Sequence, residues 1–136
     1  MAAPVPTCPC GRQDRSGRVL SLAACCGRYL GHFESTPAPD AESLMRSRYT
    51  AFVLGDADYL RATWHASRRP MDLAPEPGAK WLGLEVRASQ LVDIDHAEVE
   101  FVARQRDAGG RATRLHERSR FVREQGRWYY VDGDIR

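Results

Sequence analysis

The chain has 136 residues, which is enough for one domain with a single hydrophobic core and a small appendage. Its formal net charge of +2 is too small to indicate a nucleic-acid-binding protein, and no apolar run approaches the roughly 20 residues of a membrane span. The N-terminus lacks the charged start and apolar stretch of a signal peptide, so we expect a cytoplasmic protein that does not enter a membrane.

The four cysteines form two close pairs near the N-terminus, Cys8 with Cys10 and Cys25 with Cys26. In a reducing compartment this clustering indicates a metal site more than disulfides. Zn²⁺ prefers four soft ligands in a tetrahedron, and a complete set of four thiolates leaves no open position, so the predicted zinc is structural. Four buried reduced thiols, or a strained disulfide between Cys25 and Cys26, are the alternatives, and His32 is a less favoured substitute ligand.

The segment that leads to the second cysteine pair, from Leu20 to Ala24, is predicted to form a short helical turn that ends at that pair. Residues 34–39 contain two prolines and small side chains, which oppose helix formation and burial and therefore predict a linker. We accordingly divide the chain into a zinc knuckle over residues 1–34 and a main domain over residues 35–136.

Two helices are predicted to open the main domain. Asp40 is suited to cap the first helix, apolar residues then recur at helical spacing, and Gly55 is suited to end it. Asp56 caps a second, shorter helix that we extend to Trp64. Residues 65–78 are proline-rich and are predicted to form an irregular rim or lid.

Beyond residue 80 the apolar period becomes two, which predicts strands. The four predicted strands cover residues 81–91, 96–106, 112–123 and 127–132. Helices followed by an antiparallel meander predict an α+β fold, in which a curved antiparallel sheet wraps around the long helix to form a cone.

The register of the strands follows from matching their apolar faces. The match requires an odd number of loop residues around 108–110, for which we expect a three-residue loop, and a two-residue turn at 125–126. The predicted opposed pairs are Phe101 with Glu117, Phe121 with Tyr130, and Ser119 with Asp132. Two carboxylates, those of Glu117 and Asp132, are therefore expected on the concave face of the sheet.

These segments resemble the YchJ family of bacterial proteins over nearly the whole chain. The motifs that carry the resemblance are Met45–Tyr49, Asp56–Leu60, Thr63–His65, Trp81–Leu84, Phe101–Arg104, Glu117–Phe121 and Trp128–Tyr130. The N-terminal cysteines resemble the SEC-C motif, which implies bound zinc and a docking surface for protein partners. The main domain resembles the cone-shaped fold of nuclear transport factor two. The 14 residues between Cys10 and Cys25 exceed the usual spacing, so the knuckle must absorb an insertion.

We interpret the chain first as a zinc-binding adaptor that docks a macromolecular partner through its knuckle. A homodimer formed through the sheet stays open. Nucleic acid is disfavoured by the modest net charge, although the four-cysteine knuckle leaves association with ribosomes or RNA open. We interpret the eight arginines between Arg104 and Arg127 as solvated surface charge. A serine triad is rejected because no histidine is assigned to the face that carries Ser119 and Asp132. The sequence contains no glycine-rich phosphate loop.

The alternative interpretation is an enzyme or small-ligand binder that uses a concave pocket. Glu117 would act as a general acid or base there, with His65 as a second proton carrier. A structural ion pair between Glu117 and Arg46 or Arg48 is the competing interpretation. The remaining residues assigned to the pocket are Tyr59, Trp64, Trp81, Phe101, Ser119 and Tyr130.

Overall fold

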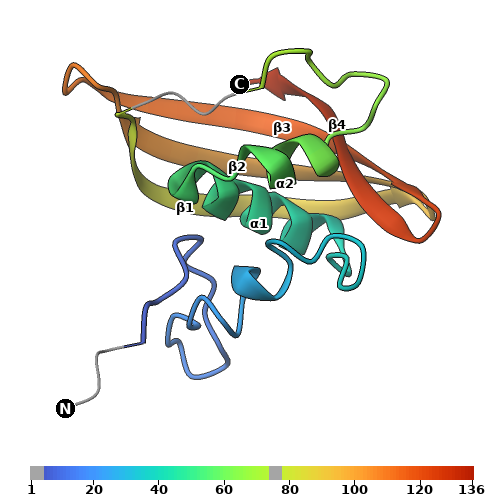
Figure 1. Ribbon diagram of the computed structural model, residues 1–136, viewed down its shortest axis with the longest axis horizontal. Helices are drawn as coiled ribbons and strands as arrows, with labels where there is room; N and C mark the ends of the chain where they lie inside the picture. The colour runs from blue at the N-terminus through green and yellow to red at the C-terminus, as the bar shows by residue number, and fades with distance from the viewer. Residues whose placement is uncertain (1–4, 74–77) are drawn as a thin grey trace.

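Three layers make up the protein: a four-stranded sheet, two helices on one face of it, and an N-terminal leader (residues 5–34) beyond the helices (Figure 1). The computed structural model describes residues 5–73 and 78–136. The elements in chain order are η1 (Cys26–Arg28), α1 (Ala41–Leu54), α2 (Ala57–Ala62), β1 (Lys80–Asp93), β2 (His96–Arg106), β3 (Ala112–Glu124) and β4 (Arg127–Ile135). The predicted α+β class, with helices against a curved antiparallel sheet, is confirmed.

The sheet is a simple antiparallel meander in the order β1-β2-β3-β4. The expected pairs of Phe101 with Glu117 and of Phe121 with Tyr130 are both present. Arg106 pairs with Ala112, so the hairpin loop holds an odd number of residues as the apolar faces require, although it is five residues long instead of three. The two-residue turn at 125–126 is confirmed, and both of its residues have the positive φ of a primed turn.

The expected pairing of Ser119 with Asp132 is wrong. A bulge opposite the Arg120–Phe121 step places one extra residue in β4, so Ser119 lies opposite Gly133 and Asp132 lies opposite Arg120. The Nε of Arg120 donates to Oδ1 of Asp132 over 2.6 Å on the convex face. Glu117 is therefore the one carboxylate of the expected two that faces the concave side.

Helix α1 begins and ends at the predicted residues. The side chain of Asp40 accepts a hydrogen bond from the backbone N–H of Ser43 over 2.7 Å, and Gly55 terminates the helix with φ of 72°. Its apolar stripe faces the sheet, but its polar side is also buried, including Ser43, Ser47 and Thr50. The helix is buried on both sides because the leader covers the side that the sheet does not.

Helix α2 ends earlier than predicted because the following segment pairs with β4. Trp64 forms a parallel bridge with Tyr130, whose backbone N–H donates to the carbonyl of Thr63 over 2.8 Å. The expected rim over residues 65–78 includes 74–77, which lie outside the described residues. Among the helices of the described residues, none has the length and apolar content to cross a bilayer.

Acidic partners neutralise much of the arginine-rich convex face. Arg118 contacts Glu98 and Glu100, and Arg120 contacts Asp134 as well as the residue opposite it. These cross-strand pairs are partly exposed, which agrees with the interpretation of the arginine cluster as surface charge.

Candidate metal centre and internal cavity

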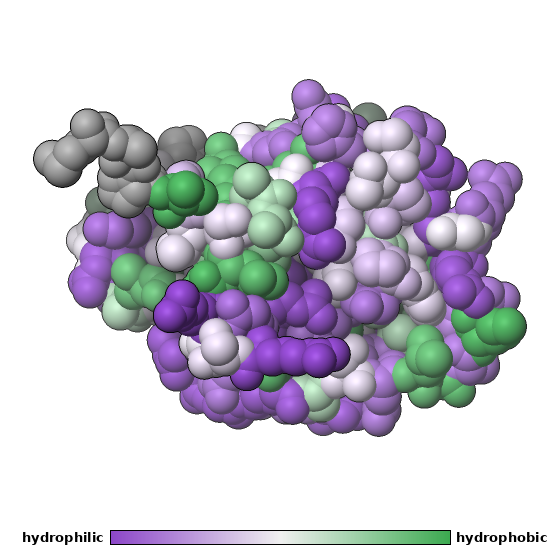
Figure 2. Space-filling view, turned by 90° about the horizontal axis from the view of Figure 1, so that it is seen from below, coloured by the Kyte–Doolittle hydropathy of each residue, from purple (hydrophilic) through white to green (hydrophobic). Residues whose placement is uncertain are grey.

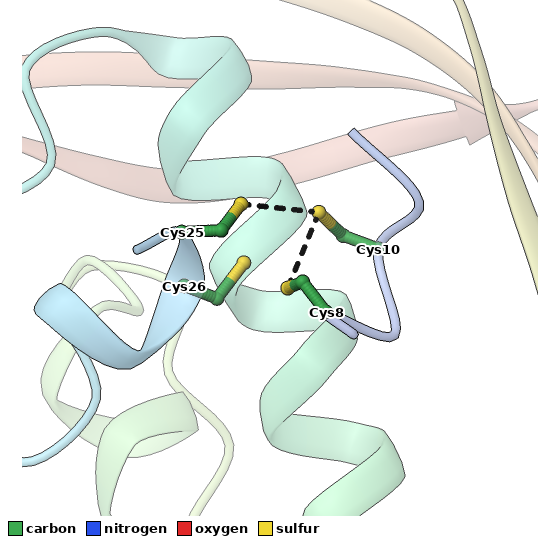
Figure 3. Close-up of side chains that lie close together, drawn as sticks. All are labelled: Cys8, Cys10, Cys25 and Cys26. Atoms are coloured by element: carbon green, nitrogen blue, oxygen red, sulfur yellow. Dashed lines mark hydrogen bonds between the residues drawn. The ribbon is translucent and has the colours of Figure 1, made fainter. Parts of the chain in front are cut away.

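The two cysteine pairs converge on one point. All four side chains are buried, and their sulfur atoms lie within 4.8 Å of one another. The sulfurs of Cys8 and Cys10 are 3.5 Å apart, and those of Cys10 and Cys25 are 3.7 Å apart (Figure 3). A tetrahedral site with metal–sulfur bonds of about 2.3 Å requires sulfur separations of about 3.8 Å. The residues therefore fit a four-thiolate metal site without rearrangement of the backbone.

Local backbone structure brings the pairs together. The backbone N–H of Cys8 donates to the carbonyl of Leu20 over 2.8 Å, and short antiparallel bridges join residue 7 to 21 and residue 13 to 19. The long insertion between the pairs thus forms a small hairpin. Gly27 follows the second pair, and its backbone passes so close to Leu22 that an added Cβ would lie 2.7 Å from the Leu22 carbonyl oxygen.

The helical turn expected before the second pair is wrong in its position. Residues 22–25 form turns, and the 3₁₀-helix η1 begins at Cys26 itself, with Cys25 in the preceding position. The turn before η1 is closed by hydrogen bonds from the backbone N–H groups of Cys25 and Gly27 to the carbonyl of Leu22. The second cysteine pair therefore starts a helical segment where a helix end was expected.

Helix α1 packs against the thiol cluster. The hydroxyl of Thr50 lies 3.7 Å from the sulfur of Cys8, and Nη1 of Arg46 donates to the carbonyl of Cys10 over 3.1 Å. Arg46 also pairs with Glu42, so it does not form the expected ion pair with Glu117. These contacts join the segment that carries the first cysteine pair to the helix.

Proximity and burial shift the pKa values of Cys8 and Cys25 in opposite directions. Hydrogen bonding with Cys10 holds the pKa of Cys8 well below its usual value. Burial, reinforced by the nearby sulfurs of Cys10 and Cys8, raises the pKa of Cys25 to about 12. Several thiolates can coexist at such distances only when a cation compensates their charge. His32 is exposed and does not belong to the cluster, so the expected four-cysteine set needs no substitute.

A cavity of about 240 Å³ lies between α1 and the concave face of the sheet. Six residues assigned to a pocket from the sequence line it: Trp64, Trp81, Phe101, Glu117, Ser119 and Tyr130. The pocket assigned from the sequence contained no residue of α1, although a pair of Arg48 with Glu117 was considered; the helix adds Met45, Arg48, Tyr49 and Phe52. The relevant signal is the spacing of Arg48, which lies three residues after Met45 and four residues before Phe52. This spacing places Arg48 on the same helix face as these two apolar residues.

Glu117 is held by neutral donors. One of its oxygens, Oε2, accepts hydrogen bonds from the hydroxyls of Ser119 and Tyr130, the latter over 3.2 Å. Burial raises the pKa of Tyr130, and the nearby charge of Glu117 raises it further. The phenol therefore stays protonated and acts as a hydrogen-bond donor.

Arg48 occupies the opposite wall. Its Nη1 donates to the carbonyl of Leu60 over 2.8 Å and to the hydroxyl of Thr63 over 2.7 Å. The guanidinium carbon lies 4.6 Å from the ring centre of Tyr130 and 5.1 Å from that of Trp64, which stabilises the cation through the ring faces. Burial lowers the pKa of Arg48 to about 10, which leaves it charged at neutral pH. The expected ion pair between Arg48 and Glu117 does not form among the described residues.

The structure does not place two of the sequence-assigned residues in this cavity. Tyr59 lies outside the cavity, where its buried hydroxyl is 2.7 Å from that of Ser47 and burial raises its pKa to about 12. His65 lines a separate surface hollow, where its Nε2 lies 2.7 Å from Oε2 of Glu124. Glu117 and His65 are therefore not brought together as an acid–base pair.

The family profile described as "YchJ, middle NTF2-like domain" matches residues 40–133 of this chain. A UPF0225 protein of Polaromonas sp. is 68% identical over 129 residues, covering 95% of this chain and 93% of that protein. The solution structure of a SEC-C motif containing protein from Rhodopseudomonas palustris is similar with a TM-score of 0.78 and 33% identity, covering 94% of this chain and 97% of that one. The crystal structure of a SEC-C motif containing protein from Psychrobacter arcticus is similar with a TM-score of 0.76 and 29% identity, covering 96% and 82%.

Proposed function

Because this chain belongs to the YchJ (UPF0225) family and carries a four-cysteine cluster, we propose that it is a zinc-binding adaptor protein. In this proposal Cys8, Cys10, Cys25 and Cys26 hold one structural Zn²⁺. The ion fixes the shape of the leader, and the outer face of the leader docks a protein partner.

The single observation that carries the proposal is the convergence of four buried sulfurs within 4.8 Å. Four soft ligands at this spacing suit zinc and complete its coordination, so no position is left for a substrate. Bound zinc would cross-link two parts of a segment whose regular structure is limited to the short helix η1 among the described residues. This favours a structural site over a catalytic one.

The outer face of the leader supports docking of a protein. Residues 13–19 are exposed, and they combine two arginines, Arg15 and Arg18, and the apolar side chain of Val19 with one acidic residue, Asp14. Val5, which is 69% exposed, adds a second apolar group. On the side from which the leader is seen, a hydrophobic patch lies left of centre among hydrophilic groups (Figure 2). A partner segment that combines apolar and acidic side chains would complement this mixture.

The test begins with the metal. Elemental analysis of the full chain, purified without a polyhistidine tag, is expected to find about one equivalent of zinc. The double variant Cys25→Ser/Cys26→Ser is expected to contain none. A wild-type protein without zinc after purification from zinc-supplemented cells would overturn the metal part of the proposal.

The adaptor part of the proposal is tested by immobilising the zinc-replete protein through its C-terminus and passing a lysate of the source cells over it. The lysate proteins that stay bound are quantified by mass spectrometry. One partner is expected to be enriched by the wild type and lost with Cys25→Ser/Cys26→Ser. Val19→Glu, which alters the leader surface, should also lose it while keeping zinc. Ile94→Glu is the matched control, because Ile94 is an exposed apolar residue of the β1–β2 turn. No enrichment, or full retention by Val19→Glu, contradicts docking through this face.

A further inference from the structure

The internal cavity contains features that the adaptor proposal does not use. Its walls are mostly apolar and include the rings of Trp81, Phe101 and Phe121. Its volume of about 240 Å³ exceeds the roughly 150 Å³ of an engineered cavity that admits benzene. It is smaller than the 300 Å³ or more that is usual for drug-sized ligands. The volume and the apolar lining suit one planar ligand with a single ring or two fused rings.

Arg48 presents hydrogen-bond donors to this space. Its Nη1 is occupied by Leu60 and Thr63, while its Nε and Nη2 have no acceptor among the described residues. The residue is only 6% exposed, so a buried cation faces the cavity with donors to spare. Neither of these two nitrogens is among the fully buried unpartnered atoms of the described residues, so both keep accessible surface that a ligand acceptor would cover.

Glu117 presents the complementary group on the other side. Its Oε2 accepts from Ser119 and Tyr130, while its Oε1 has no donor among the described residues. The opposite charges of Arg48 and Glu117 therefore share one cavity without an ion pair between them in the described part of the chain. For a ligand with one charge, the attraction of one of these groups is offset by the repulsion of the other, so the cost of removing that charge from water is not compensated.

We propose that this cavity is a binding site for a neutral, planar aromatic molecule whose polar edge combines a hydrogen-bond acceptor with a donor, as a carboxamide or lactam does. The acceptor meets Arg48, the donor meets Glu117, and the ring lies among the aromatic walls. This proposal does not depend on zinc or on a docked partner.

Access to the cavity does not require the sheet to open. Leu115, which lines the cavity from β3, is 36% exposed, and Phe52 and Trp81 are partly exposed beside the same space. A side chain larger than leucine at position 115 would therefore reduce the cavity from its open side. This position offers a test that leaves Arg48 and Glu117 in place.

The experiment uses the full, metal-replete chain and two matched probes, indole-3-carboxamide and indole-3-carboxylate. Binding is followed by isothermal titration and by the indole N–H signals of Trp64 and Trp81 in NMR spectra. The carboxamide is expected to bind saturably at one site per chain. The carboxylate is expected to bind at least about tenfold more weakly, because it places an anion in the cavity that contains Glu117.

Two variants and one control identify the site. Leu115→Trp is expected to abolish carboxamide binding, whereas Leu82→Trp, at an exposed strand position outside the cavity lining, should keep it. Glu117→Gln is expected to reverse the preference by about tenfold or more toward the carboxylate, a change that a merely structural glutamate would not produce. Dispersed NMR spectra establish that each variant is folded.

The proposal is overturned if the wild type does not bind the carboxamide. It is equally overturned if folded Leu115→Trp binds as well as Leu82→Trp, or if folded Glu117→Gln keeps the wild-type preference. None of these results would affect zinc content or partner capture, so the adaptor proposal stands or falls separately.

Discussion

A Cβ atom added at Gly133 would lie 2.5 Å from Oε2 of Glu117. The carboxylate therefore packs against bare backbone on the neighbouring strand. Gly133 has no positive φ, so this position requires a small residue for space and not for backbone conformation. The bulge in β4 creates the contact, because it moves Gly133 opposite Ser119, the hydrogen-bond donor of Glu117.

Gly133→Ala is expected to displace the Glu117 carboxylate and to lower the free energy of unfolding by about 1–3 kcal/mol, the usual cost of overpacking. It should also weaken binding of indole-3-carboxamide. Urea denaturation and titration measure the two effects. Gly109→Ala is the control, because a Cβ there meets only Asp107 at an ordinary 3.5 Å. Equal stability of the two variants would contradict the packing argument.

Removal of metal is expected to loosen the leader more than the sheet. The leader contains little regular structure, whereas the strands are joined by continuous ladders. Hydrogen exchange after treatment with a chelator should show lost protection in residues 5–34 and retained protection in β2 and β3. Equal loss in both regions would show that the leader and the main domain unfold as one unit, against the predicted division at residue 34.

The hydroxyl of Thr50 is expected to tune the metal site, since it lies 3.7 Å from the sulfur of Cys8 and is fully buried. A hydroxyl that donates to a ligating thiolate orients it and offsets its charge. Thr50→Val should therefore weaken zinc binding about tenfold or more, measured by competition with a chromophoric chelator. Thr50→Ser keeps the hydroxyl and should bind nearly as the wild type does. Wild-type affinity in Thr50→Val would exclude this role.

Much of the fold could be predicted from interactions between residues that are close in the sequence. The N-cap at Asp40, the helix end at Gly55 and the turn at 125–126 depend on side chains within a few residues, so the sequence contains all the necessary information. The convergence of the cysteines was likewise predictable from their paired spacing and their metal preference.

The errors in strand pairing and in the placement of side chains arose where distant segments decide the geometry. The β4 bulge accompanies the pairing of Trp64 with Tyr130, which joins the end of α2 to the last strand and has no local sequence signal. The same pairing directs His65 toward Glu124 and away from the cavity. Burial of α1 on both sides was missed because its polar residues face the leader, a distant segment of the chain that contacts the helix at points such as Thr50 and Cys8.

The pair formed by Glu100 and His116 makes stability depend on pH. His116 Nε2 lies 2.8 Å from Oε2 of Glu100 across β2 and β3, and this hydrogen bond holds the pKa of Glu100 below its usual value. Because the folded state binds this proton less readily than the unfolded state, the stabilisation is complete above the ordinary glutamate pKa of about 4.3 and is lost as pH falls through the lowered value.

Glu100→Gln is therefore expected to lower the unfolding free energy at pH 7 and to have little effect at pH 2.5. The difference at pH 7 should be smaller in 1 M salt, because salt screens charges that are partly exposed. Urea denaturation at each pH measures this. Glu85→Gln removes an exposed carboxylate whose cationic partner, Arg87, lies on the same strand at 3.5 Å, and it should produce a smaller difference. A Glu100→Gln effect that persists unchanged at pH 2.5 would mean that the side chain stabilises the sheet through packing and not through its charge.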